Sequence, residues 1–132
     1  MTKEEKTAVV GLCMEYRPAL RRVRKNTRDA EVLERKAKEA KSNLERGILL
    51  EVAKIKYTQI AADKEIISRC EDGFSKLDGL DACVMRQLYV EGKQQTEVKG
   101  ESGNVITERR VRVIRDRAVE TMKSCGIPVV SG

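Results

Sequence analysis

The stretch over residues 27–72 most constrains the fold of this 132-residue chain, because it contains no proline and a single glycine, Gly47. Its apolar residues recur at alternating steps of three and four, the heptad spacing of a helix that packs along one side. They form two runs: Leu33, Ala37, Ala40 and Leu44, then Ile48, Val52, Ile55, Gln59, Ala62 and Ile66. We therefore predict one long helix over about residues 27–72.

A helix of this length needs a partner. At 1.5 Å per residue it would span roughly 60–70 Å, more than a domain of about fifty residues can cover. We expect self-association, as a homodimer through the N-terminal helices. Two alternatives stay open. A step of four between Leu44 and Ile48, where three is due, coincides with Gly47 and fits an αα-hairpin that breaks there. An intramolecular three-helix bundle would need no second copy.

The N-terminal segment, residues 3–25, has a helical stripe of its own, formed by Val9, Leu12, Tyr16, Leu20 and Val23. Pro18 disfavours helix at Arg17, so we expect a kink or a break there. With 36% charged and 3% aromatic residues in the whole chain, the composition favours helices over sheets. The predicted fold class is all-α: a long N-terminal helical hairpin or coiled coil over 1–72, a small helix-turn-helix domain over 73–126 and a tail over 127–132.

A second helix is predicted over residues 106–123. Thr107 stands at the N-cap position, where its hydroxyl can accept a backbone N–H of the first turn. Glu108 follows it at the positive end of the helix dipole. One face carries Val111, Ile114, Ala118 and Met122, and the arginines that lie mostly off that face are Arg109, Arg110, Arg112 and Arg117. Such a helix suits contact with nucleic-acid phosphate, although charge-rich helix faces are often only solvated.

The segment before it, residues 77–98, reads as a helix, a turn and a stub of helix. Leu80, Val84 and Leu88 supply a stripe, joined less regularly by Cys83, and Gly92 is placed to end the helix. The predicted order over residues 77–123 is therefore helix, turn and helix.

This order resembles region four of the bacterial housekeeping sigma factors, the helix-turn-helix domain that reads the upstream promoter element. Residues 88–92 (LYVEG) look like the family's helix end and turn, and Glu97-Val98 looks like the core of its first helix-turn-helix element. The family's recognition-helix pattern, T-x-x-R-(I/V)-R-x-I-x-x-x-A, is matched by Thr107, Arg110, Val111, Arg112, Ile114 and Ala118. The resemblance covers about a third of the chain.

The chain departs from the family between the two helix-turn-helix elements. Residues 99–105 (KGESGNV) make the connection about two residues longer, and Gly100, Gly103 and Asn104 favour a flexible or hairpin-like turn. The family's base-reading positions hold Glu108, Arg109 and Val113, so its promoter specificity does not carry over. The docking geometry does, with the N-terminal end of the second helix in the major groove.

The layout as a whole is similar to small sigma-like regulators of phages and prophages of Firmicutes. It implies a cytoplasmic regulator in a bacterial host cell that binds duplex DNA, with host RNA polymerase as a further partner. The implied DNA-binding residues are Thr107, Arg109, Arg110, Arg112, Val113, Arg115 and Arg117.

The net charge is +6, and residues 17–46 hold eleven basic against five acidic residues. The densest basic run there, Arg21, Arg22, Arg24 and Lys25, is a second candidate patch for phosphate or an acidic protein, unless it is simply a solvated face.

Other classes of function find little support in the sequence. The chain has no histidine, its four cysteines lie far apart, and no phosphate-binding glycine loop occurs, so we expect no metal, no cofactor and no catalysis. No signal peptide or long apolar run predicts a membrane segment, and we expect a reduced cytoplasmic setting. The alternative function is a phage protein-binding module, either an inhibitor of a host protein or a genome-packaging adaptor, built on a repurposed helix-turn-helix.

Overall fold

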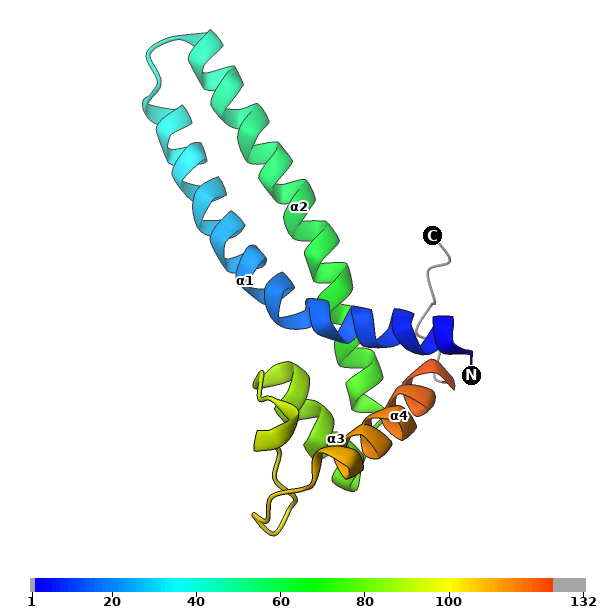
Figure 1. The fold of residues 1–132 in the computed structure, drawn as a ribbon. Helices are drawn as coiled ribbons and strands as arrows, with labels where there is room; N and C mark the ends of the chain where they lie inside the picture. The colour runs from blue at the N-terminus through cyan, green and yellow to red at the C-terminus, as the bar shows by residue number, and fades with distance from the viewer. Residues whose placement is uncertain (1, 125–132) are drawn as a thin grey trace. The chain divides into compact units, whose positions relative to one another are not determined.

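The computed structural model describes residues 2–124 and is all-α, as the sequence predicts. Its elements, shown in Figure 1, are α1 (Lys3–Glu39), α2 (Asn43–Ser75), α3 (Gly79–Met85), a π-helical turn η1 (Arg86–Val90), a 3₁₀ turn η2 (Gln95–Glu97) and α4 (Glu108–Ser124). No β-strand occurs over residues 2–124, where the only bridge is an isolated antiparallel one between Lys99 and Val105. The predicted tail, 127–132, lies outside the described residues.

The chain divides into two compact units. We call residues 18–67 the hairpin unit, and residues 2–17 together with residues 68–124 the terminal unit. Residues 2–17 thus belong with the later part of the described chain, whereas the sequence placed them with the long helices. The sequence analysis allowed for a break at Pro18, but α1 continues through this residue. Pro18 is the first residue of the hairpin unit.

The prediction of one helix over residues 27–72 is wrong. The chain turns at residues 40–42, and within the hairpin unit α1 and α2 run side by side in opposite directions (Figure 1). The hairpin alternative is therefore correct, but the break comes before Gly47, which lies inside α2. Because the turn contains neither glycine nor proline, its composition does not mark it.

Hydrogen bonds from two side chains hold this turn. The Glu45 N–H donates to Ser42 Oγ at 3.1 Å, which caps the start of α2. The Arg46 guanidinium donates to the carbonyls of Ala37 and Ala40, at 3.2 and 3.3 Å, and so satisfies acceptors at the end of α1. Side chains therefore pair one backbone N–H at the start of α2 and two backbone carbonyls at the end of α1, which would otherwise lack partners within the helices.

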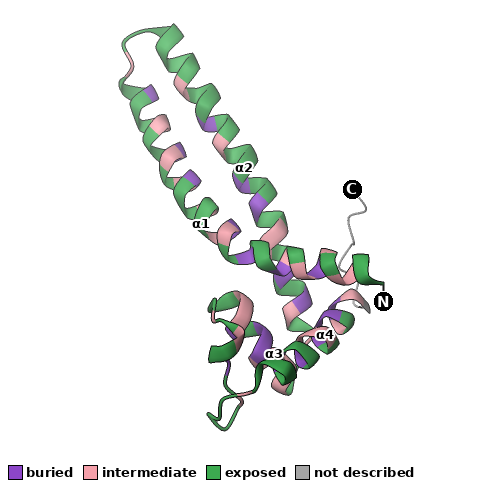
Figure 2. Ribbon diagram, in the orientation of Figure 1, coloured by how far each residue is buried: buried purple, intermediate pink, exposed green. Residues whose placement is uncertain are grey.

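The interior of the hairpin unit is made largely of alanine. Figure 2 shows buried positions, in purple, at intervals along α1 and α2. Its buried side chains are Ala19, Asn26, Ala30 and Ala37 of α1 with Ala53, Ile60 and Asp63 of α2. Asp63 is only 7% exposed, and its charge is compensated by Arg22, whose Nη2 lies 3.0 Å from Asp63 Oδ1. Small side chains let the two helices approach each other closely. A helix without a neighbour would have no need of small residues along one face.

The heptad register predicted for α2 is off by one residue. Ala53 and Ile60 face the interior, whereas the predicted positions Ile48, Val52 and Ile55 are exposed. The reason is physical: α2 carries a second apolar stripe, about 100° around the helix from the buried one, and its larger side chains give it the stronger periodic signal.

The terminal unit has a core in two clusters. In one, Val9 and Cys13 of α1 pack with Met85, Ala118, Val119 and Met122; in the other, Val84 and Val98 pack with Val111 and Ile114. The predicted N-terminal stripe is confirmed at Val9 and Tyr16, which are buried, while its other members are partly buried. Ion pairs between Lys6 and Asp116, at 2.8 Å, and between Glu5 and Lys123 add to this packing.

Candidate nucleic-acid interface

Helix α4 begins immediately after Thr107, as the sequence predicts. The Arg110 N–H donates to Thr107 Oγ1 at 3.3 Å, and the Val111 N–H donates to the Thr107 carbonyl at 2.9 Å. The predicted stripe is fully buried, with at most 2% exposure for Val111, Ile114, Ala118 and Met122. Burial of one face fixes the rotation of α4, and hence which side chains it presents outward.

Three arginines of the first two turns of α4 point into solvent. Arg109, Arg110 and Arg112 are exposed, and their guanidinium groups form no ion pair or side-chain hydrogen bond with any residue from 2 to 124. Thr107 and Val113 are exposed beside them, Val113 at 58%. This set, which we call the arginine surface, can bind an anionic partner without first breaking an internal contact.

The other two candidate arginines have partners within the terminal unit. Arg117 Nε donates to both carboxylate oxygens of Asp81, at 3.0 and 3.1 Å, and this hydrogen bonding raises the pKa of Arg117. Arg115 is more buried, with 20% of its side chain exposed, and its Nη2 lies 3.6 Å from Asp116 Oδ1. Arg117 therefore ties α4 to α3, and Arg115 faces the interior of the unit.

A short hairpin precedes the arginine surface. Lys99 and Val105 form the antiparallel bridge, the Gly100 N–H donates to the Asn104 carbonyl at 2.8 Å, and Gly103 adopts a φ of +85°. This positive φ is the conformation that glycine tolerates at no steric cost. The hairpin-like connection inferred from the glycines is thus confirmed.

Gln87, which the sequence analysis did not single out, holds this hairpin in place. Its side chain is buried at 6% exposure, its Nε2 donates to the Lys99 carbonyl at 2.7 Å, and its Oε1 accepts the Lys99 N–H at 2.9 Å. Nε2 also donates to the Cys83 carbonyl, at 3.2 Å. The side-chain amide thus pairs with Lys99 as a neighbouring strand would. In the sequence, the only local indication of this role is a polar residue, Gln87, directly before Leu88 of the apolar stripe.

The element expected to be the first helix of the helix-turn-helix is a single 3₁₀ turn, η2. A capping box closes it: the Gln94 N–H donates to Glu97 Oε1 at 3.1 Å, and the Gln94 side chain accepts from the Glu97 backbone. Gly92, with a φ of +73°, ends the preceding helical segment as expected. The chain therefore presents α4 on a turn and a hairpin rather than on a complete helix pair.

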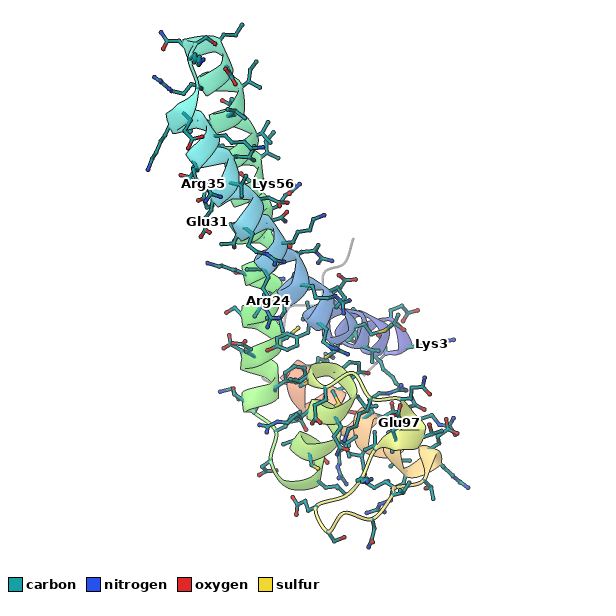
Figure 3. All side chains as sticks on the ribbon, turned by 90° about the vertical axis from the view of Figure 1, so that its left-hand side faces the viewer. Lys3, Arg24, Glu31, Arg35, Lys56 and Glu97 are labelled. Atoms are coloured by element: carbon teal, nitrogen blue, oxygen red, sulfur yellow. The ribbon has the colours of Figure 1, made fainter. Side chains whose placement is uncertain are left out.

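The second basic patch lies on α1 in the hairpin unit. Arg21, Arg24 and Lys25 are exposed, whereas Arg22 is engaged by Asp63. Figure 3 shows Arg24 and, farther along α1, Arg35. All four candidate residues there are thus exposed, and Arg22 is in addition paired with Asp63.

The described residues contain neither a metal-binding cluster nor a helix suited to a membrane. No group of three or more cysteine or acidic side chains in residues 2–124 is placed to hold a metal ion. Cys13 and Cys70 are buried free thiols, and burial raises the pKa of each to about 12. No helix in this part of the chain has the length and apolar character needed to cross a bilayer.

No family model, curated protein or solved structure matches this chain. The surfaces described above are therefore the basis on which a function can be assigned.

Proposed function

We propose that this protein binds duplex DNA through the arginine surface of α4, with some sequence preference, as a sigma-like transcription regulator of phage or prophage origin in the bacterial cytoplasm. The observation that carries the proposal is the set of exposed, unpaired guanidinium groups of Arg109, Arg110 and Arg112 on a capped helix whose opposite face is buried. The N-terminal end of a helix also carries a positive partial charge that favours phosphate.

In this arrangement the first two turns of α4 enter the major groove. Arg109, Arg110 and Arg112 contact base edges and phosphates, and Thr107 and Val113 lie close enough to touch the groove wall. Because Arg117 is held by Asp81, its main role is to fix α4 on α3. The Lys99–Val105 hairpin adds a basic side chain, Lys99, next to the helix start.

The test is a salt titration of binding to fluorescently labelled duplex DNA, followed by anisotropy. The logarithm of the association constant should fall with the logarithm of salt concentration by about 0.9 for each phosphate contact. The triple variant Arg109→Ala, Arg110→Ala, Arg112→Ala should bind more weakly and with a shallower slope, and melt like the wild-type protein. Arg35→Ala, an exposed arginine of the hairpin unit, is the charge-matched control. Unchanged binding by the triple variant would refute the proposal.

We also propose that the hairpin unit joins two copies of the chain. The second apolar stripe of α2 is exposed by 76% at Leu44, 57% at Ile48, 37% at Val52 and 55% at Ile55. Burying such side chains is worth about 25 cal/mol per Å² of apolar area. A homodimer through α2 would also pair two arginine surfaces, which suits binding of two half-sites on DNA.

Sedimentation at increasing protein concentration tests the dimer. Ile48→Glu combined with Ile55→Glu should shift the protein to monomer, whereas Leu50→Glu, an exposed apolar residue on the other flank of α2, should not. A wild-type protein that stays monomeric would refute the homodimer.

The same stripe favours the alternative function, a protein-binding module that inhibits a host protein or serves as a packaging adaptor. A host partner such as RNA polymerase, bound through the stripe by a monomer without DNA, would support this alternative. So would a ring-sized oligomer that does not bind DNA.

A further inference from the structure

The terminal unit contains a pocket of about 540 Å³ between the first half of α1, η1, η2 and α4. Its apolar lining, which we call the floor, is formed by Val10 and Cys13 of α1 with Leu88 and Tyr89 of η1, and Met14 of α1 also lines it. Cys13 is buried, while Met14 is 63% exposed at the opening. Neither the apolar floor nor its volume is explained by DNA binding.

Three cations stand around this apolar floor, on Arg17, Lys93 and Arg115, against one lining carboxylate, that of Glu108. Lys93 Nζ is partly engaged, at 3.7 Å from Glu91 Oε1 and 3.4 Å from Gln87 Oε1. Arg17 forms no ion pair with any residue in the described part of the chain. The pocket therefore combines apolar walls with an excess of positive charge.

Arg115 has a hydrogen-bond donor without a partner. Its Nε is buried and is not hydrogen-bonded to any described residue, although its Nη2 lies 3.6 Å from Asp116 Oδ1. Buried polar atoms are nearly always paired, so this unpaired donor shows that the packing around Arg115 leaves its charge only partly compensated.

The Arg17 guanidinium lies against the turn at Gly92. A Cβ added at Gly92 would overlap Arg17 Nη1, so the guanidinium occupies space that the glycine leaves open. Gly92 also has a φ of +73°. The turn thus places the Arg17 charge close against its backbone, at the rim of the pocket.

We propose that this pocket binds a small organic anion with an apolar body, its acidic group paired with Arg115 and Arg17 and its body on the floor of Val10, Leu88 and Tyr89. Such ligands bind where a mainly apolar cavity carries a few convergent charged groups. Because Glu108 and Arg115 belong to α4, the bound anion adds negative charge near the arginine surface and weakens phosphate binding there. This coupling rests on the proposed function; the pocket itself does not.

The first experiment uses two fluorescent probes of similar shape, anilinonaphthalene sulfonate and its uncharged relative N-phenylnaphthylamine. We expect the sulfonate to bind one site per chain, about tenfold more tightly than the neutral probe. Arg115→Gln should weaken the sulfonate about tenfold and change the affinity for the neutral probe less than about twofold. Arg35→Gln, with the same change of charge at an exposed position that does not line the pocket, should leave both affinities unchanged.

Arg17→Gln gives a second reading, because Arg17 is exposed and its loss should not unfold the protein. It should weaken the sulfonate about threefold to tenfold. Equal affinity for the two probes would overturn the proposed anion site. So would unchanged sulfonate affinity in each of the two single variants, Arg115→Gln and Arg17→Gln.

The second experiment measures duplex-DNA affinity with and without saturating sulfonate probe. We expect DNA binding to weaken about threefold or more, and the probe to bind less tightly to the DNA complex by the same factor. If the probe binds as described but DNA affinity is unchanged, the coupling is wrong and the pocket stands. If the protein does not bind DNA at all, the probe experiment still shows whether the pocket binds an anion. Failure of the proposed function and failure of the pocket can therefore be told apart.

Discussion

Replacing Gln87 with leucine should loosen the hairpin that precedes the arginine surface. The leucine side chain has a similar size but cannot pair with the Lys99 N–H and carbonyl, which the amide now meets at 2.9 and 2.7 Å. Each such hydrogen bond contributes about 1 kcal/mol net, and leaving a buried backbone group unpaired costs about 1–3 kcal/mol. We therefore expect Gln87→Leu to lower the free energy of unfolding of the terminal unit by about 2–3 kcal/mol.

Amide hydrogen exchange at Lys99, together with urea unfolding, measures this effect. In Gln87→Leu the Lys99 amide should exchange faster, and the midpoint of unfolding should fall. Lys99→Ala is the matched control, because it removes the side chain and keeps both backbone groups that Gln87 pairs with, so its stability should stay within about 0.5 kcal/mol of wild type. If Gln87→Leu matches that control and the Lys99 amide stays protected, the role assigned to Gln87 is wrong.

Two further predictions concern the terminal unit. Gly92→Ala and Gly103→Ala should each destabilise it by about 1–2 kcal/mol, because both residues have a positive φ that a Cβ disfavours, and the nearest atoms that the new Cβ meets at Gly92 belong to the flexible Arg17 side chain, which can shift; thermal melting measures both losses, and a variant as stable as wild type would contradict the argument. The hydrogen bond from Lys123 lowers the pKa of Glu5 from 4.5 to about 2, so its stabilising effect is present above about pH 4.5 and is lost as the pH falls toward 2. Lys123→Met should therefore be less sensitive than wild type to acid over this range in melting experiments, by a small amount because the pair is exposed.

Helix α4 could be predicted because its signals are local. A threonine at the cap and apolar residues at helical spacing are both read from neighbouring positions, and the structure has Thr107 and Val111 as expected. The exposure of Arg109, Arg110 and Arg112 follows from the same spacing, because a helix that buries one stripe must turn its other faces outward.

The turn between α1 and α2 is marked in the sequence by a helix-capping pattern, which the periodicity argument did not consider. Ser42-Asn43-Leu44-Glu45 has the S-x-x-E spacing of a capping box, and the Ser42 hydroxyl does cap α2. Arg46, which closes the end of α1, acts back across the turn on carbonyls six and nine residues earlier. Heptad spacing that continues through a turn hides it, because periodicity alone does not say whether one helix or two carry the pattern.

The pocket and the role of Gln87 could not be predicted, because each depends on residues that meet only in the folded chain. Arg17 lies 75 residues before the glycine it packs against, and Gln87 pairs with a backbone twelve residues away. Arg115 shows the consequence for site prediction. The resemblance placed it among the implied DNA-binding residues, whereas packing of α4 against α1 and η1 turns it toward the pocket.

The error in the register of α2 is itself informative about assembly. The buried stripe, at Ala53 and Ile60, uses small side chains because α1 lies close, whereas the stripe one residue earlier holds larger aliphatic side chains such as Ile48 and Ile55. A helix that packs against a single neighbour should carry polar residues on its remaining faces. Helix α2 instead carries two apolar stripes at heptad spacing, the pattern expected of a helix that is covered on two sides. Since α1 covers only one of them, the second stripe is left exposed, and the proposed homodimer would bury it against the same stripe of a second copy.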